Sequence, residues 1–324
     1  MAQDILIVGE MEDGAPTSTT LELIGAATSL AEGGAVSVTL LGAGASAAAS
    51  RAFEGGAAKA LTSDDAVYDE FRADQWVAAV EAALDETGAA VVLMAQSNVG
   101  RDVGPRLAFR RETAVATDCV GLSNEGGSFR ATRSCYGGNA NATYSFATSP
   151  AIATVRAKAF DASEPNAGAS GESFELPAAG DSRSTITGRE QAEATGLQIQ
   201  DATVVVSGGR GLGDEEGFRV VEELASAIGD DRAAVGASRA ACDLGWYPVS
   251  QQVGLTGKVV TPDLYIAIAI SGASQHMAGC SGSKMIVAIN RDAEANIFKE
   301  ARYGIVGDYK QVLPPLIEAV KALD

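Results

Sequence analysis

The one histidine of the chain, His276, lies in a loop of small residues. The loop reads ISGASQHMAGCSGSK from 270 to 284, and the apolar runs YIAIAI and MIVAI flank it. Glycine and serine at such a position let a ligand approach the backbone closely. A histidine there can stabilise negative charge that develops on the ligand. This loop is therefore the first candidate for chemistry.

Polar residues also follow other apolar runs of the second half. We expect strands at 203–206, 233–236, 264–270, 285–289 and 305–306, with helices at 215–228 and 309–322. Each strand is followed by a group of hydroxyl, amide or charged side chains: Ser207 to Arg210, Ser238 and Arg239, Ser271 and Gly272, Asn290, and Asp308. In an open parallel sheet, ligands bind at the edge formed by the carboxyl ends of the strands. The sequence thus predicts one ligand site built from distant segments.

The first half also alternates strands with helices. We expect strands at 4–10, 35–42 and 89–95, a helix at 74–84, and a helix introduced by the capping-box spacing of Thr19 and Glu22. A β-rich stretch follows at 129–156, then a loop at 160–183 and a short charged stretch at 188–196 that marks a linker. This predicts two α/β domains, an N-terminal domain at 1–198 with an added β segment and a C-terminal parallel-sheet domain at 199–324.

Composition excludes several classes of protein. The net charge of the 324-residue chain is −18, which argues against a nucleic-acid partner. Its 24 basic residues include few lysines, and such acidity favours a salt-rich cytoplasm and a halophilic source. We expect no signal or transit peptide, because the start MAQDILIVGE has no basic stretch. Four cysteines without a CxxC pair, and one histidine, disfavour a zinc site, so we expect no metal.

Two glycine motifs point to nucleotides but fail in detail. GGRGLG, starting at Gly208, lacks the G-x-G-x-x-G spacing, because Asp214 stands where the last glycine is needed. GLTGK ends at Lys258, but Val259 follows where a P-loop has serine or threonine. The backbone donors, hydroxyls, two arginines and single histidine that remain suit a dinucleotide with a redox-active ring.

Five segments resemble one known family. They are VVVSGGRGL (204–212), VGASRAACDLGW (235–246), QVGLTGKVVTPDLYIAIAISGASQHMAG (252–279), SKMIVAIN (283–290) and YGIVGD (303–308). Dense and colinear, they resemble the α subunit of electron transfer flavoprotein. More loosely, SNVGRDVGPRLA (97–108) and VRAKAF (155–160) resemble its N-terminal domain, so the resemblance covers essentially the whole chain.

The resemblance implies an electron carrier rather than an enzyme with its own substrate. It implies a heterodimer with a β subunit, in which residues 199–324 hold one FAD and the first domain contacts the partner. The β subunit is expected to carry AMP or a second FAD. Acyl-CoA dehydrogenases of fatty acid oxidation would donate electrons, and a membrane quinone reductase would accept them. The alternative is a free-standing nucleotide-dependent oxidoreductase, although a single histidine makes a catalytic base with its partner hard to build.

The resemblance also implies the residues that contact FAD. Those expected to bind it are Arg210, Ser238, Arg239, Val253, Gly254, Leu255, Thr256, Ser271, Gly272, Ala273, Ser274, Gln275, His276, Asn290, Asp308 and Tyr309. Among them, the Thr256 hydroxyl is expected at flavin N5, whereas Asn290 and Asp308 are expected at the adenosine. Arg239 and His276 are expected to stabilise reduced flavin.

Two positions depart from the family pattern. Leu255 stands where the family commonly has glutamine, and Arg302 replaces an acidic residue. An apolar side chain at 255 is expected to remove a polar contact to the flavin or to shift its potential.

Overall fold

The computed structural model describes residues 2–138, 140–188 and 197–323, which form two compact units. The first unit comprises Met1–Cys135 and Asn141–Gly188, and the second comprises Tyr136–Ala140 and Arg189–Asp324. The charged stretch predicted as a linker lies outside the described residues, apart from Gly188. The boundary at 198/199 stays a prediction.

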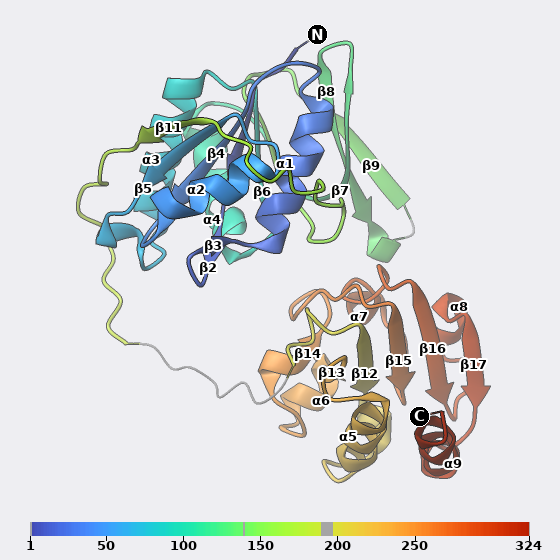
Figure 1. Cartoon of the computed structure of the whole chain (residues 1–324). Helices are drawn as coiled ribbons and strands as arrows, with labels where there is room; N and C mark the ends of the chain where they lie inside the picture. Colours follow the sequence, from blue (N-terminus) through green and yellow to red (C-terminus); the bar gives the residue numbers. More distant parts are fainter. Residues whose placement is uncertain (1, 139, 189–196, 324) are drawn as a thin grey trace. The chain divides into compact units, whose positions relative to one another are not determined.

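The first unit is built on a nine-stranded sheet (Figure 1). Its strand order is β11 (Glu172–Glu175), β5 (Lys59–Ser63), β4 (Val36–Leu41), β1 (Ile5–Val8), β6 (Val91–Ala95), β10 (Ala151–Val155), β7 (Val115–Glu125), β8 (Ser128–Cys135) and β9 (Ala140–Ser145). Strands β11 to β7 pair in parallel, and β7 pairs with β8 in an antiparallel hairpin. The added β segment predicted at 129–156 therefore begins earlier, at β7. Its last strand, β10, pairs in parallel with β6 and β7.

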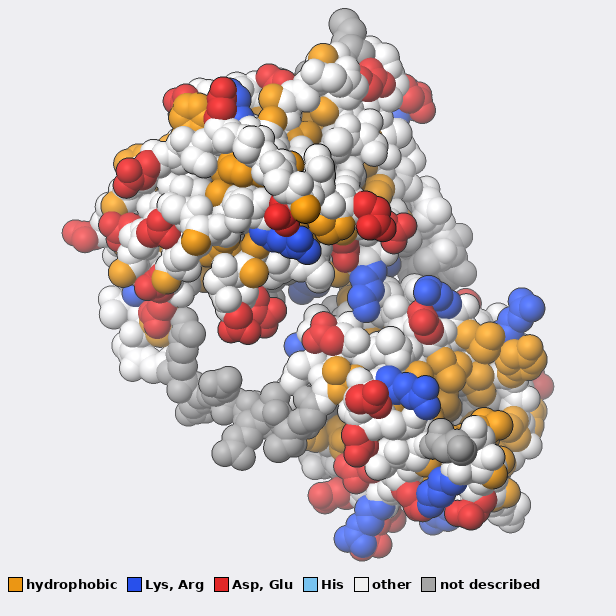
Figure 2. All heavy atoms as spheres, in the orientation of Figure 1, with side chains coloured by type: hydrophobic (Ala, Val, Ile, Leu, Met, Phe, Trp, Pro, Cys, Tyr) orange, Lys and Arg blue, Asp and Glu red, His pale blue; other side chains and the backbone are white. Residues whose placement is uncertain are grey.

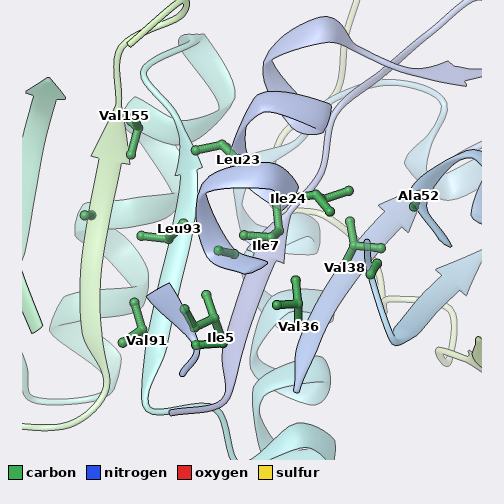
Figure 3. Close-up of a cluster of buried hydrophobic side chains, with 14 of the residues drawn as sticks. Ile5, Ile7, Leu23, Ile24, Val36, Val38, Ala52, Val91, Leu93 and Val155 are labelled. Atoms are coloured by element: carbon green, nitrogen blue, oxygen red, sulfur yellow. The ribbon is translucent and has the colours of Figure 1, made fainter. Parts of the chain in front are cut away.

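Helices cover both faces of this sheet because its central strands are apolar on both sides. Ile5 and Ile7 of β1 pack with α1 (Ser18–Leu30) and α2 (Ala45–Glu54), as Figure 3 shows for part of the cluster. Leu6 and Val8 pack on the other face with α3 (Ala73–Thr87) and α4 (Asn98–Arg110). This alternation gives the three layers of a doubly wound α/β domain.

Two local predictions for the first unit were wrong. The N-cap of α1 is Thr17, whose hydroxyl accepts the Thr20 amide hydrogen at 3.2 Å, so the predicted capping box at Thr19 does not form. The predicted loop at 160–183 contains edge strand β11, which has two charged residues and is recognisable only by its backbone pairing with β5. A short hairpin of β2 (Met11–Glu12) and β3 (Ala15–Pro16) also follows β1.

The second unit contains a six-stranded sheet whose pairs are all parallel. Its order is β14 (Gln252–Val253), β13 (Ala233–Ser238), β12 (Val204–Gly208), β15 (Leu264–Ile268), β16 (Met285–Asn290) and β17 (Tyr303–Val306). Helices α5 (Gly217–Ile228) and α9 (Tyr309–Lys321) pack on one face. The short helices α7 (Ser274–Met277) and α8 (Ile297–Glu300) contribute to the core on the other face, and α6 (Arg239–Asp243) follows β13.

An apolar region lies on the surface of the second unit. Figure 2 shows acidic side chains over both units and hydrophobic side chains gathered near β16 and β17. The latter include Tyr303, Ile305 and Val306 of β17, which are exposed. Within the described residues, none of the helices has the length and apolar character needed to span a bilayer.

Candidate functional site

The parallel pairing of the second sheet places the carboxyl ends of its strands along one edge. Gly208 ends β12, Ser238 ends β13, Asn290 ends β16, and Val306 ends β17 two residues before Asp308. The four polar groups predicted after these strands therefore lie at one edge of the sheet, as a ligand site in this fold class requires.

A cavity of about 250 Å³ lies at this edge. Four predicted site residues line it: Arg210, Asn290, Asp308 and Tyr309. Arg291 and Lys310 also line it, and sequence reasoning missed both, although each directly follows a predicted residue. Three cationic side chains thus surround one small cavity in a chain of net charge −18. Such a cavity suits an anionic ligand with hydrogen-bonding groups.

Hydrogen bonds fix three side chains of this cavity, those of Asn290, Asp308 and Tyr309. The Asn290 side-chain amide donates to the Ile270 carbonyl at 2.9 Å, which ties the end of β16 to the loop after β15. Asp308 caps α9 by accepting the Lys310 amide hydrogen at 2.9 Å. The hydroxyl of buried Tyr309 donates to the Leu212 carbonyl at 2.7 Å. Each side chain is therefore held before any ligand binds, which lowers the entropic cost of binding.

The loop after β15 contains an unusual backbone conformation. Ala269, which lines the cavity, has φ = +55°, a left-handed value that costs free energy for a residue with a Cβ. Its carbonyl accepts the Gly211 amide hydrogen at 3.2 Å, and a Cβ on Gly209 would lie 2.3 Å from the same oxygen. Glycines of the GGRGLG motif therefore let two loops meet at the cavity.

A second group of predicted residues lies in two loops that touch each other. Strand β14 places Val253 beside Ser238 of β13. The Leu255 amide donates to the Gln275 carbonyl at 2.7 Å, and a Cβ on Gly279 would lie 2.3 Å from the Gly254 nitrogen. The loop at 253–256 is therefore packed directly against the loop that contains His276.

Most side chains of these two loops are exposed. Leu255 is 62% exposed, and the Thr256 hydroxyl accepts a hydrogen bond from the Gln252 side-chain amide at 3.0 Å. Exposed residues of the other loop are Ser271, Ala273, Ser274 and Gln275. Gly272 is buried with φ = +78°, and a Cβ there would lie 2.2 Å from the Ile297 nitrogen. The glycine therefore has a packing role.

His276 differs from its neighbours because it is only 7% exposed. Its Nε2 lies 2.9 Å from the hydroxyl of Tyr265, a fully buried residue of β15. Its Nδ1 is buried and has no hydrogen-bond partner among the described residues. Burial lowers the pKa of His276 to about 4, opposed by a smaller effect of the Val253 backbone. The imidazole is therefore neutral at pH 7, and it can donate one hydrogen bond rather than supply a full charge.

Arg239 does not line the cavity. It begins α6, is exposed, and its Nε lies 3.3 Å from a carboxylate oxygen of Asp243 one turn later. Both side chains are more than half exposed, so this ion pair contributes little to stability. Arg239 can therefore exchange Asp243 for another anion at small cost.

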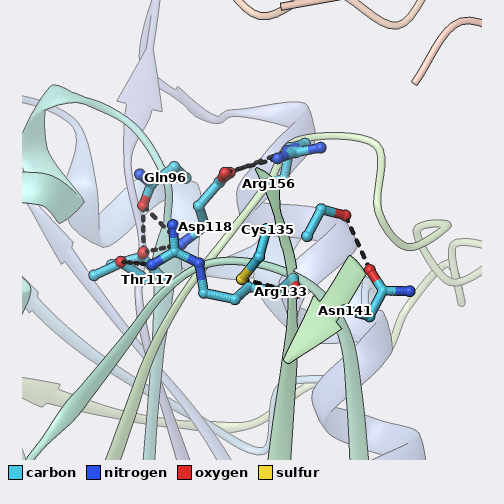
Figure 4. A network of polar contacts seen from close by, with 9 residues as sticks. Gln96, Thr117, Asp118, Arg133, Cys135, Asn141 and Arg156 are labelled. Carbon is cyan, nitrogen blue, oxygen red and sulfur yellow. Dashed lines mark hydrogen bonds and ion pairs between the residues drawn. The ribbon is translucent and has the colours of Figure 1, made fainter. Parts of the chain in front are cut away.

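Polar clusters of the first unit have structural roles. Arg156 binds Asp118 through two hydrogen bonds of 3.0 and 2.6 Å, and Gln96 and Thr154 accept from the Asp118 amide (Figure 4). These contacts join β6, β7 and β10 where the sheet changes from parallel to antiparallel pairing. A cavity of about 910 Å³ lies between α3 and α4, but Arg106 and Arg110 in its wall are paired with Asp102 and Glu81. We assign this cavity no ligand.

Comparison with known proteins identifies the family. The sequence-family model for the electron transfer flavoprotein domain matches residues 5–180. The family model for the electron transfer flavoprotein FAD-binding domain matches residues 198–281. The chain belongs to the electron transfer flavoprotein family. It is 39% identical to the electron transfer flavoprotein subunit alpha of Bacillus subtilis (strain 168), over 100% of this chain and 99% of that protein. It is 42% identical to the alpha subunit of Mycobacterium tuberculosis (strain H37Rv), over 98% of each.

These similarities confirm several predictions. The α/β fold with a FAD-binding domain in the second half is confirmed, as is the electron-carrier role of an electron transfer flavoprotein alpha subunit. A third relative, 35% identical over 98% of this chain and 96% of its own length, is named protein FixB, of Clostridium saccharobutylicum. The free-standing oxidoreductase is not favoured. Relatives named "subunit alpha" imply a beta-subunit partner.

Proposed function

We propose that the chain binds one FAD along the carboxyl edge of its second sheet and carries electrons within a heterodimer with a β subunit. The adenosine and phosphate groups would be held by Arg210, Asn290, Asp308 and Tyr309. Ser238, Arg239, Val253–Thr256 and Ser271–His276 would hold the flavin end. The observation that carries the proposal is the cavity at the strand edge, where four residues predicted from distant segments meet.

The residues present fit this cofactor. Arg210, Arg291 and Lys310 supply positive charge for a pyrophosphate, and Asp308 and Asn290 offer hydrogen-bonding oxygens for a ribose or an adenine edge. The buried Nδ1 of His276 lacks a partner among the described residues, as expected of a group that completes its hydrogen bonding on a ligand.

Bound FAD supplies the reversible uptake of electrons, and the protein tunes how readily this happens. Neutral His276 would donate one hydrogen bond to a flavin oxygen that becomes more negative on reduction. Arg239, released from Asp243, would place a full positive charge near the same ring. The Thr256 hydroxyl would contact N5. The contacts of His276 and Arg239 would be stronger to the more negative reduced ring than to the oxidised ring, so these two would raise the reduction potential.

The finer assignments rest on the family resemblance and composition. The donors would be acyl-CoA dehydrogenases of fatty acid oxidation, and the acceptor would be a membrane quinone reductase. The β subunit would carry AMP or a second FAD. The net charge of −18 with few lysines supports a halophilic cytoplasm as the working environment.

The test is an absorption spectrum of the chain co-purified with its β subunit in high salt, before and after heat release of the cofactor. We expect flavin bands and release of one FAD for each α chain if the β subunit carries AMP, or of two if it carries a second FAD. Arg210→Gln should weaken FAD binding, whereas Arg219→Gln on α5 is the matched control, because Arg219 is exposed and does not line the cavity. A colourless complex that takes up no added FAD would overturn the proposal.

A further inference from the structure

Tyr265 is a buried phenol that the proposed function does not use. It lies on β15, in the same buried cluster as Met277 of α7, and its side chain is fully buried. Burial raises the pKa of its hydroxyl well above the ordinary value of 10, with Ser207 and Cys280 exerting smaller effects. The hydroxyl is therefore protonated at every physiological pH, and its proton needs an acceptor.

The best-placed acceptor is His276. The distance of 2.9 Å between the Tyr265 oxygen and His276 Nε2 is that of a hydrogen bond, and the imidazole is neutral. A neutral imidazole has one bare nitrogen and one N–H, and its neighbours decide which is which. If the tyrosine donates, Nε2 is the bare nitrogen and the proton resides on Nδ1.

The other ring nitrogen is available for this proton. Nδ1 is buried and has no hydrogen-bond partner among the described residues. An N–H on Nδ1 can be donated to a ligand oxygen, whereas a lone pair there cannot. The Tyr265 hydroxyl at Nε2 thus selects the Nδ1–H form.

We propose that Tyr265 is a positioning residue for His276: its hydroxyl donates to Nε2 and fixes the proton on Nδ1, so that the imidazole presents an N–H donor to the cofactor. This inference rests on the proposed function, since the cofactor is FAD at this edge. A proton on Nε2 would leave Nδ1 as an acceptor, which repels an oxygen that gains negative charge. Tyr265 would therefore act on the reduction potential without touching the ring.

Because the chain has one histidine, the protonation of each ring nitrogen can be measured without overlap from other imidazoles. His276 is the only histidine, so a full chain labelled with ¹⁵N-histidine and freed of any histidine tag gives one imidazole spectrum. We expect Nδ1 to be protonated and Nε2 to be bare in the wild-type chain. In Tyr265→Phe the proton should shift toward Nε2. Tyr247→Phe is the matched control, because it removes another hydroxyl of this unit, one that bonds Glu222 instead of His276.

The second measurement is the midpoint potential of FAD in the complex with the β subunit. Losing a fixed donor should weaken binding of reduced relative to oxidised FAD by about tenfold, which lowers a two-electron potential by about 30 mV. Tyr247→Phe should leave the potential unchanged.

The possible results distinguish a failure of this inference from a failure of the proposed function. A wild-type spectrum with the proton on Nε2 overturns the inference, even if Tyr265→Phe does not fold. A tautomer unchanged in Tyr265→Phe does the same. If the proton moves but the potential does not, His276 does not face the flavin, and the link to the cofactor is overturned. A wild-type complex that binds no FAD instead defeats the proposed function and leaves the tautomer result standing.

Discussion

Replacing His276 should make the second unit less sensitive to acid. Its pKa is lowered by burial from the ordinary 6.5 to about 4 in the folded chain. Between these values the unfolded chain binds a proton that the folded chain does not, so stability falls as the pH decreases from about 6.5 to about 4. One pKa unit corresponds to about 1.4 kcal/mol, so lowering the pH from 7 to 5 costs about 2 kcal/mol through this residue alone.

The assay compares two proteins, because many carboxyl groups also titrate in this range. Urea unfolding at fixed salt is followed at pH 7 and pH 5 in the apo chain and in His276→Gln. The chain has two tryptophans, Trp76 in the first unit and Trp246 in the second, so a Trp76→Phe background leaves Trp246 as reporter of the second unit. We expect the loss of stability to be about 2 kcal/mol smaller in His276→Gln. Equal losses in both proteins would refute the buried, neutral imidazole.

Three further outcomes are expected. Thr256→Ala should keep FAD bound but shift the potential by roughly 40 mV, the equivalent of about 1 kcal/mol in a one-electron couple; an unchanged redox titration contradicts the N5 contact. Arg239→Ala should lower the potential, while Asp243→Asn, which frees Arg239 from its ion pair, should maintain or raise it; a rise in Arg239→Ala contradicts the charge argument. The melting temperature should increase from low salt to molar KCl, and equal values would argue against adaptation to high salt.

The parallel sheets could be predicted from the sequence because their strands are continuous apolar runs. Strands β12 and β15 are buried along most of their length, and such runs indicate parallel strands covered on both faces. Edge strand β11 and interior strand β7 were harder to predict. Strand β11 reads ESFE, and β7 mixes polar with small residues, so backbone pairing rather than side-chain pattern defines them. The short helices α6, α7 and α8 contain four or five residues, too few to show a helical period.

The candidate site likewise has features that the sequence could predict and one that it could not. Residues at strand ends could be predicted, because the carboxyl ends of parallel strands meet at one edge, and Arg210, Asn290 and Asp308 line one cavity there. The environment of His276 could not be predicted from the sequence, because the Tyr265 hydroxyl approaches the imidazole from a different element in the core. A sequence shows which residue types follow a strand, but whether a side chain turns outward or inward depends on packing that has no local signal.

The glycine turn of the first unit shows why a nucleotide-like sequence need not bind a nucleotide. Gly42 and Gly44 introduce α2 after a buried strand, much as phosphate-binding turns do. Here the chain supplies its own anions: Asp64 accepts the Ser46 amide hydrogen at 3.2 Å, and Asp69 accepts that of Ala43 at 2.8 Å. Hydrogen bonds from Ser46, with weaker ones from Ala45 and Gly44, lower the pKa of Asp64, so the carboxylate is ionised where a phosphate would lie. The cavity of the second unit is lined by three cationic side chains instead. The two units thus share a fold class but carry charges of opposite sign at these two sites.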